Sequence, residues 1–219
     1  MTVDVEQEKR VAAEAAAALV EDGMAVGLGT GSTVAYLLPA LADRRLSVRC
    51  VATSPRTEET ARALGIRVES FDTLDHFDVA IDGADQVAPD GWLVKGGGAA
   101  HTREKLVAVS ADRFVVIADS TKPVERLHAP VPLELLAYGL GSTLRRLGPV
   151  TLRAVPRSPD GGVIADYTGA FDDPSALATF FESTPGVVGH GLFPPSLVST
   201  VLVGRGAAVD PVDVDRGTH

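Results

Sequence analysis

Phe114-Val115-Val116-Ile117-Ala118 is an uninterrupted apolar run, with Arg113 before it and Asp119 after it. A strand that is apolar at every position can be buried on both faces, whereas a strand with one solvated face alternates apolar and polar residues. Strands of the first kind are typical of parallel sheets that are covered by helices. The run therefore predicts an inner strand of an α/β sheet.

The chain before this run alternates between strand-like and helix-like segments. We expect strands at 24–28, 48–53, 66–69, 77–81 and 92–94, and helices at 6–21, 33–41, 57–64 and 103–110. Such alternation predicts a parallel sheet in an α/β domain. Ligands of these sheets bind beyond the carboxyl ends of the strands, so the loops that follow strands are the first candidates for a site.

The pattern changes near Pro130. Strand-like segments at 131–135, 150–155, 163–167 and 187–193, with helices at 137–147 and from about Pro174, follow in the order βαββαβ. This order predicts a ferredoxin-like α+β subdomain. A last strand, 197–203, can return to the first sheet. We therefore expect a catalytic domain from 1–128 and 197–219, and a smaller domain from 129–196.

The composition limits the function classes. The chain has 219 residues, of which 45% are hydrophobic and 22% charged, as in a folded protein with a core. Its 20 Lys and Arg against 29 Asp and Glu give a net charge of −9, which argues against a nucleic-acid partner. The single cysteine, Cys50, excludes an intramolecular disulfide. A charged N-terminus without a long apolar run predicts a cytoplasmic protein that has no membrane partner.

Glycine and hydroxyl residues fill the segment Gly27-Leu-Gly-Thr-Gly-Ser-Thr33, between a strand and a helix. Backbone N–H groups of such a loop can converge on an anion at the helix N-terminus. The segment lacks the Gly-Lys-Ser/Thr of a Walker A motif, and Ser32 stands where a dinucleotide fingerprint needs glycine. The hydroxyls of Thr30, Ser32 and Thr33 suit a phosphate or a sugar. A tight turn with an N-cap serine is the alternative.

Two carboxylates follow the strand at 77–81, in Asp82-Gly83-Ala84-Asp85. Both can face a cleft, where they can bind metal, accept sugar hydroxyls or move protons. An ordinary Asp-rich turn is the alternative. Metal is the weakest of these possibilities, because none of the five histidines stands at ligand spacing. We expect no metal and no cofactor.

Three consecutive glycines, Gly96-Gly97-Gly98, form the least ordinary segment. They lose much conformational entropy on folding, so a loop that lies against a ligand explains them better than a linker. Lys95 can place a cation beside developing negative charge. Glu104, in the first turns of the next helix, is a candidate general base, and a solvated residue paired with a nearby Lys or Arg is the alternative. His101 can line the same site.

Another loop that follows a strand is Asp119-Ser-Thr-Lys122. The ammonium group of Lys122 is a candidate phosphate contact, and a surface lysine is the alternative. Cys50 stands in an apolar strand, where we expect a small core residue.

The ordered set of loops resembles one family closely, the type A ribose-5-phosphate isomerases. The matching segments are 29–33 (GTGST), 82–85 (DGAD), 95–100 (KGGGAA), 102–105 (TREK) and 117–122 (IADSTK). Each motif alone is weak, whereas their order and spacing are specific, and the likeness covers nearly the whole chain. The resemblance implies a Rossmann-like parallel-sheet domain with a smaller ferredoxin-like α+β domain. It also implies a homo-oligomer, with a dimer favoured, that needs no metal or nucleotide.

The resemblance further implies interconversion of D-ribose 5-phosphate and D-ribulose 5-phosphate through an enediolate, in the non-oxidative pentose phosphate pathway. Glu104 would move a proton between C2 and C1, and Lys95 would stabilise the enediolate oxygens. Asp82 and Asp85 would assist ring opening and proton movement between oxygens. The implied contacts to the sugar phosphate are Thr30, Gly31, Ser32, Thr33, Asp82, Gly83, Ala84, Asp85, Lys95, Gly96, Gly97, Gly98 and Lys122.

Two other functions compete with this one. A non-catalytic sugar-phosphate sensor would share the fold, but it would have no need to keep Asp82, Asp85, Lys95 and Glu104 together. A nicotinamide-dependent oxidoreductase would need a dinucleotide fingerprint, which fails at Ser32 and lacks an acidic residue after the second strand. His101 departs from the family pattern, which commonly has an apolar residue at this position.

Overall fold

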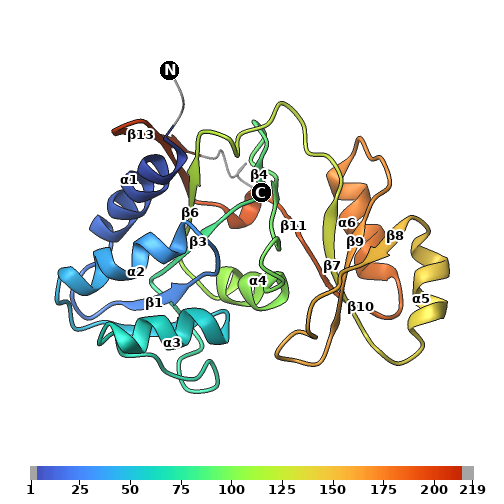
Figure 1. Cartoon of the computed structure of the whole chain (residues 1–219), viewed down its shortest axis with the longest axis horizontal. Helices are drawn as coiled ribbons and strands as arrows, with labels where there is room; N and C mark the ends of the chain where they lie inside the picture. The colour runs from blue at the N-terminus through green and yellow to red at the C-terminus, as the bar shows by residue number, and fades with distance from the viewer. Residues whose placement is uncertain (1–3, 214–219) are drawn as a thin grey trace. The chain divides into compact units, whose positions relative to one another are not determined.

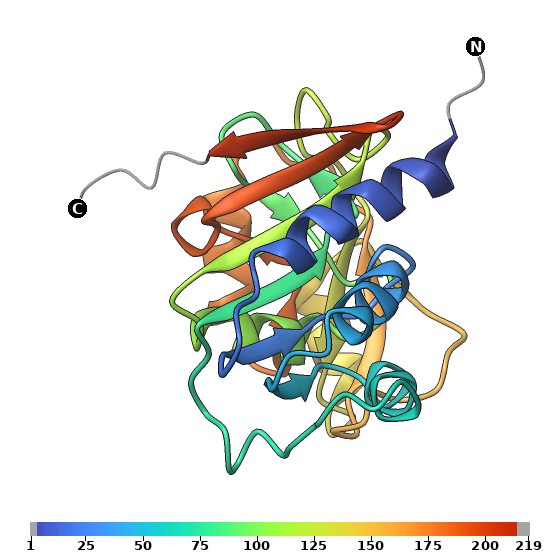
Figure 2. The same cartoon turned by 90° about the vertical axis from the view of Figure 1, so that its left-hand side faces the viewer.

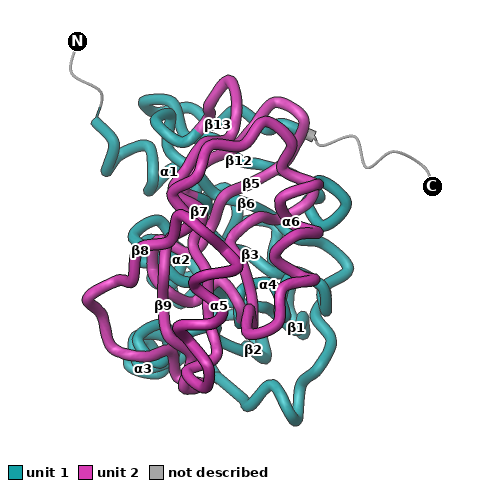
Figure 3. The backbone as a smooth tube through the Cα atoms, turned by 90° about the vertical axis from the view of Figure 1, so that its right-hand side faces the viewer, with its two compact units in different colours: residues 1–84, 103–122, 195–219 teal, residues 85–102, 123–194 magenta. Residues whose placement is uncertain are grey.

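The computed structural model describes residues 4–213, which form two compact units. Within that range, the first unit contains residues 4–84, 103–122 and 195–213, and the second contains 85–102 and 123–194 (Figure 3). Each unit has its own hydrophobic core.

A six-stranded sheet forms the centre of the first unit, in the order β13-β12-β6-β3-β1-β2. All pairings from β2 to β12 are parallel, and only β13 is antiparallel. This sheet confirms the predicted Rossmann-like domain, and all six residues of β6 are buried, as the apolar run predicts. The strands, labelled in Figure 1 or described here by their bounds, are β1 Ala25–Leu28, β2 Arg49–Ala52, β3 Val79–Gly83, β6 Phe114–Asp119, β12 Thr200–Arg205 and β13 Ala208–Asp213.

Helices cover both faces of this sheet. Of these, α1 crosses in front of the sheet in Figure 2, α2 packs against α1, and α3 lies beside β2. The fourth packs on the other face, where Val107 of α4 occupies the space that a side chain on Gly27 of β1 would need. Four buried alanines of α1 let this helix approach the sheet closely. The bounds are α1 Val5–Ala18, α2 Val34–Asp43, α3 Pro55–Ala63 and α4 His101–Val109.

The order of the strands creates a topological switch point between β1 and β3. From β1 the chain moves to β2 on one side, and it later returns to β3 on the other side. The loops that follow β1 and β3 therefore leave neighbouring strands in different directions. Open α/β sheets bind their ligands at such points. The loop at 29–33 and Asp82 stand at this edge of the sheet.

Three parts of the prediction for this sheet are wrong. The strand expected at 92–94 is not part of it, because Leu93 and Val94 pair in a separate antiparallel sheet. The expected strand at 66–69 is a single bridge, in which Val68 pairs with Cys50. The Cys50 N–H donates to the Arg67 carbonyl at 3.0 Å, and the Glu69 N–H donates to the Cys50 carbonyl at 2.8 Å, but the pairing does not extend into a strand. The edge strand β13 was not expected from the sequence, since Pro211 interrupts its apolar pattern.

The second unit contains a four-stranded antiparallel sheet with the order β10-β7-β9-β8. Numbered along the chain, this order is 4-1-3-2, and the elements follow as βαββαβ. This arrangement confirms the predicted ferredoxin-like fold. The bounds are β7 Val131–Leu135, α5 Leu140–Leu147, β8 Val150–Leu152, β9 Val163–Tyr167, α6 Pro174–Ser183 and β10 Val187–His190.

The strand expected at 187–193 divides at Gly191. Its first part, β10, pairs with β7, and its second part, β11 (Leu192–Phe193), pairs with β5 (Leu93–Val94), which also pairs with β4 (Gln86–Val87). Gly191 bonds both ways, because its N–H donates to the Pro132 carbonyl and its carbonyl accepts the Lys95 N–H, each at 2.8 Å. A short helix, η1 (Pro195–Leu197), follows.

These pairings place residues 85–102 in the second unit together with 123–194. The compact units thus divide the chain differently from the expected domains, 1–128 plus 197–219 and 129–196. The compact units are groups of residues that contact one another, whereas the expected domains are parts of the chain that would fold separately. The bounds of the expected domains therefore stay a prediction. Among residues 4–213, no helix combines the length and the apolar character that a membrane crossing needs.

Candidate active site

The candidate residues divide between the two units. The first unit holds Thr30, Gly31, Ser32, Thr33, Asp82, Gly83, Ala84, Glu104 and Lys122, and the second holds Asp85, Lys95, Gly96, Gly97 and Gly98.

Asp82 organises the loop that follows β1. Its Oδ1 accepts the backbone N–H of Thr30 at 3.0 Å and that of Gly83 at 2.7 Å, and the residue is 2% exposed. A side chain on Gly29 would overlap with the Asp82 carboxyl group, so glycine is required there. The structure therefore brings Asp82 and Thr30 together, as expected for two loops at one sheet edge.

Hydroxyl groups hold the other side of this loop. Thr30 Oγ1 lies 2.8 Å from Thr53 Oγ1, and Thr57 Oγ1 donates to the Gly29 carbonyl at 2.9 Å. Sequence reasoning did not single out Thr53 and Thr57 for this role. The available signal was Ser54-Pro55, which begins α3 with Ser54 as N-cap and places Thr57 in its first turn.

The N-terminus of α2 carries no side-chain cap. Thr33 is the N-cap residue and makes no capping hydrogen bond, and Ser32 is exposed rather than capping. Gly31 is also exposed, and its φ of +140° needs glycine. The alternative of a turn closed by an N-cap serine is therefore wrong. The start of this ten-residue helix leaves backbone N–H groups that favour an anion.

Glu104 lies in the first turn of α4 and is 3% exposed. The solvated glutamate that was the alternative for this residue is therefore wrong. A carboxylate shielded from water can exchange protons with a bound substrate rather than with bulk solvent.

A side chain of α1 bonds the loop that follows β6. Glu8 of α1 is buried, and its Oε2 accepts the Ser120 N–H at 3.0 Å, while its Oε1 accepts the Gly206 N–H at 2.9 Å. Hydrogen bonding from the Ser120 side chain is the main cause that lowers the pKa of Glu8, with smaller effects of the Gly206 and Ser120 N–H groups and against the opposing effect of burial. Lys122 ends this loop and is half-buried.

Lys95 is the residue that follows β5, and it is 2% exposed. Its backbone N–H donates to the Gly191 carbonyl at 2.8 Å. Its Nζ lies 5.4 Å from the centre of the Phe193 ring, a distance at which the ring face attracts a cation. Strand β5, its neighbour β11 and this ring therefore place the ammonium group.

The glycine loop is tightly fitted at one end and open at the other. Gly96 has a φ of +103°, and a side chain there would come within 2.8 Å of Pro132 and 2.7 Å of His101, which is fully buried. Gly97 and Gly98 are exposed. The Gly97 N–H donates to Asp85 Oδ2 at 2.7 Å, so the structure brings Asp85 to this loop.

Arg153 also reaches the glycine loop, and Asp166 holds it there. Neither residue was a candidate from the sequence. The signal that could have found them is a pair of opposite charges inside two neighbouring expected strands, 150–155 and 163–167, which form one antiparallel hairpin.

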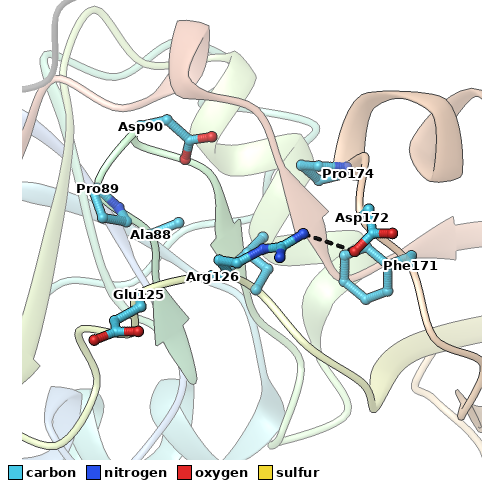
Figure 4. Close-up of a pocket in the computed structure, with 9 residues that line it drawn as sticks. Ala88, Pro89, Asp90, Glu125, Arg126, Phe171, Asp172 and Pro174 are labelled. Carbon is cyan, nitrogen blue, oxygen red and sulfur yellow. Dashed lines mark hydrogen bonds and ion pairs between the residues drawn. The ribbon is translucent and has the colours of Figure 1, made fainter.

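A separate pocket of about 230 Å³ lies within the second unit. Figure 4 shows Arg126 pointing toward Asp172, with an ion-pair distance of 2.7 Å. None of its lining residues is a candidate site residue. They are Ala88, Pro89, Asp90, Glu125, Arg126, Leu127, Phe171, Asp172 and Pro174. Across residues 4–213, no group of three or more His, Cys, Asp or Glu side chains is arranged to hold a metal ion.

The parallel sheet, with glycine loops and buried acidic and basic side chains in the chain, is typical of an α/β enzyme. The model of the ribose 5-phosphate isomerase A (phosphoriboisomerase A) family matches residues 49–207. The chain belongs to this family.

Relatives and solved structures agree with this assignment. Ribose-5-phosphate isomerase A of Caulobacter sp. (strain K31) is 45% identical over 87% of this chain and 91% of its own length. Ribose 5 phosphate isomerase A of Neisseria gonorrhoeae has a TM-score of 0.92 at 31% identity, covering 98% of this chain and 100% of that one. A D-ribose-5-phosphate isomerase solved with phospho-erythronic acid has a TM-score of 0.91 at 32% identity, covering 96% and 99%. These matches confirm the family resemblance, the fold class and the isomerase class.

Proposed function

We propose that the chain interconverts D-ribose 5-phosphate and D-ribulose 5-phosphate, with Glu104 as the general base. The observation that carries the proposal is a buried carboxylate at the start of α4, in a chain of this family. Along the sequence, Glu104 follows Lys95 and the three glycines.

In the proposed reaction Glu104 removes the proton from C2 of the open-chain aldose. The electron pair forms the C1–C2 double bond, and negative charge moves to O1. The same carboxylic acid then returns the proton to C1, while a proton passes from O2 to O1 and the ketone forms at C2. One base thus serves both carbons, and no net oxidation occurs. A triosephosphate isomerase uses a glutamate base for the same reaction class on another fold.

The other candidate residues are assigned to charge and to proton transfer between oxygens. Lys95, whose ammonium group is buried, would stabilise the enediolate oxygens. Asp82 and Asp85 would assist ring opening and the movement of the proton from O2 to O1. Gly83, Ala84 and the backbone of Gly96, Gly97 and Gly98 would contact the sugar.

Phosphate binding is assigned to the uncapped N-terminus of α2, with Thr30, Gly31, Ser32 and Thr33, and to Lys122. Helix N-termini of this kind favour phosphate through N–H groups and the helix dipole. Phospho-erythronic acid, bound in the related structure, carries a phosphate and a carboxylate. An enediolate of a sugar phosphate presents the same two kinds of negative charge, which supports a sugar phosphate as the substrate. The proposal includes the non-oxidative pentose phosphate pathway and a homo-oligomer, with a dimer favoured.

The test is isomerisation of ribose 5-phosphate by the wild type and by Glu104→Gln, with EDTA present. The substitution keeps the size of the side chain and removes the base, so we expect a loss of at least about 10²-fold in kcat. Glu14→Gln, at an exposed position of α1, is the matched control and should keep full activity.

Three other outcomes would change the assignment. A wild type that binds the sugar phosphate without converting it would indicate the sensor function. A Glu104→Gln variant with near-normal kcat would show that another group is the base. A wild type that loses activity in EDTA would show that a metal takes part.

A further inference from the structure

Arg153 connects the β8–β9 hairpin to the glycine loop. It directly follows β8, and its backbone N–H donates to the Ile164 carbonyl of β9 at 3.0 Å. Its Nε and Nη2 donate to the two carboxylate oxygens of Asp166, at 2.7 and 2.6 Å. Its Nη1 donates to the carbonyl of Gly96 at 2.8 Å and to that of Gly97 at 3.2 Å.

Asp166 fixes the plane of the guanidinium group. A bidentate arginine–carboxylate pair defines both the distance and the orientation of its partners, because the guanidinium is rigid and planar. The two side chains are only 18% and 20% exposed, so water competes weakly for these bonds. With Nε and Nη2 held by Asp166, the position of Nη1 is determined as well.

The peptide group between Gly96 and Gly97 is held at both ends by groups of opposite charge. Its carbonyl oxygen accepts from Arg153, and its N–H donates to Asp85 Oδ2 at 2.7 Å. The positive group therefore faces the negative end of the peptide dipole, and the carboxylate faces the positive end. A rotation of this peptide would break both charge-assisted bonds.

A loop of three glycines cannot hold itself in one conformation. It has no side chains to pack, and each glycine has more backbone freedom to lose than any other residue. Gly97 and Gly98 are also exposed, so packing does not restrain them. The bonds from Arg153 and to Asp85 supply the restraint from outside the loop.

We propose that Arg153, held by Asp166, is a positioning residue that fixes the Gly96–Gly97 peptide and, through it, the carboxylate of Asp85. Arg153 acts through the loop and does not touch the substrate. This inference rests on the proposed function, because Asp85 and the loop belong to the proposed site. Its effect on the reaction is a better alignment of the groups that carry charge and protons.

The experiment compares three variants of the full chain with the wild type. Arg153→Ala removes the guanidinium, and Arg153→Lys keeps the charge but cannot bond Asp166 and both carbonyls in one plane. Asp166→Asn weakens the support of the guanidinium. Arg157→Ala is the matched control, because Arg157 is an exposed arginine of the same hairpin whose Nη1 donates to the Gly161 carbonyl and, among residues 4–213, to no carbonyl of the glycine loop. Kinetic constants are referred to folded protein, measured by circular dichroism.

We expect kcat/KM for ribose 5-phosphate to fall about 10- to 100-fold in Arg153→Ala, less in Arg153→Lys and Asp166→Asn, and to stay unchanged in Arg157→Ala. Added guanidinium, at concentrations that leave the protein folded, should restore part of the activity of Arg153→Ala. A merely structural role would lower the folded fraction without this rescue.

Amide hydrogen exchange of residues 96–100 supplies a measurement that does not depend on activity. Exchange of this segment should be faster in Arg153→Ala and Asp166→Asn than in the wild type or Arg157→Ala. Faster exchange together with a wild type that does not isomerise ribose 5-phosphate would overturn the proposed function and leave the positioning role standing. Unchanged exchange in Arg153→Ala, or a kcat/KM of Arg153→Lys and Arg153→Ala within twofold of the wild type, would overturn the positioning role.

Discussion

Position 29 requires glycine because the carboxyl group of Asp82 lies directly against it. The position that a side chain would occupy is taken by the carboxyl group of Asp82, which bonds the N–H groups of Thr30 and Gly83. The smallest residue at the end of β1 therefore allows an aspartate at the end of β3 to organise both loops. The arrangement of both loops therefore depends on Gly29 and Asp82 together.

The substitution Gly29→Ala tests this close packing of position 29 against Asp82. The added methyl group would displace the Asp82 carboxyl, so we expect a loss of about 1–3 kcal/mol in the free energy of unfolding, as for other overpacked sites. Activity should fall with it, because the Thr30 and Gly83 bonds shift. Urea unfolding and the isomerase assay measure the two effects.

Gly141→Ala is the control for this prediction. Gly141 lies in α5, and the nearest atom to an added methyl group is 3.8 Å away. Alanine should be neutral there or raise the free energy of unfolding by about 0.5–1 kcal/mol. If Gly29→Ala unfolds at the same urea concentration as Gly141→Ala, the close packing against Asp82 does not constrain position 29.

At the scale of elements, α1 does more than cover the sheet. Its alanine face packs on the strands, and its one buried carboxylate, Glu8, bonds the loop after β6 and the turn between β12 and β13. The helix therefore fixes the loop that ends in Lys122. A carboxylate accepting two N–H groups stays charged in the folded protein to lower pH than in the unfolded chain.

Replacing Glu8 with Gln should lower the free energy of unfolding by about 1–3 kcal/mol at neutral pH, because the amide offers one acceptor where two are needed. Since the folded-state pKa of Glu8 lies below 4.5, its contribution is present above that pH and is lost as the pH falls through the folded value. The stability gap between wild type and variant should therefore narrow in acid.

Urea unfolding between pH 7 and pH 3 measures this gap. The exposed Glu14→Gln on the same helix should match the wild type at every pH. A gap for Glu8→Gln that stays constant, or that widens in acid, would contradict the role given to the charge.

At the scale of the whole molecule, the reactivity of Cys50 measures how often the parallel sheet opens. It lies in β2, is fully buried, and burial raises the pKa of its thiol to about 12, with a smaller contribution from Glu69. The thiolate, which is the reactive form, is therefore scarce in the native protein. As the only cysteine of the chain, it makes any labelling unambiguous.

We expect labelling by a disulfide reagent at pH 8 to be at least about 10³-fold slower in the native protein than in the urea-unfolded chain. The rate should rise in parallel with global unfolding as urea is added, because the thiol is fully buried and becomes accessible only when β2 separates from the sheet and from the side chains packed on it. Labelling that is fast without urea would show that the β2 edge of the sheet opens locally.

The sequence by itself determined the fold class, the alternation of strands and helices, the βαββαβ order and the family. These properties follow from local signals in the sequence. The signals are an apolar run such as 114–118, the helix caps, and the order and spacing of the motifs along the chain. The candidate residues came from the same source, because loops that follow parallel strands are predictable places for a site.

Only the tertiary structure decided which side chains hold those loops. Glu8 bonds Ser120 across 112 residues, and Arg153 bonds Gly96 across 57. The tertiary structure also divided the strand expected at 187–193 between two sheets, and it reduced the strand expected at 66–69 to one bridge. Such bonds depend on distance in space, and an arginine or glutamate that bonds a distant loop has the same local sequence pattern as a solvated one. For this physical reason the supports of the site became visible only in three dimensions.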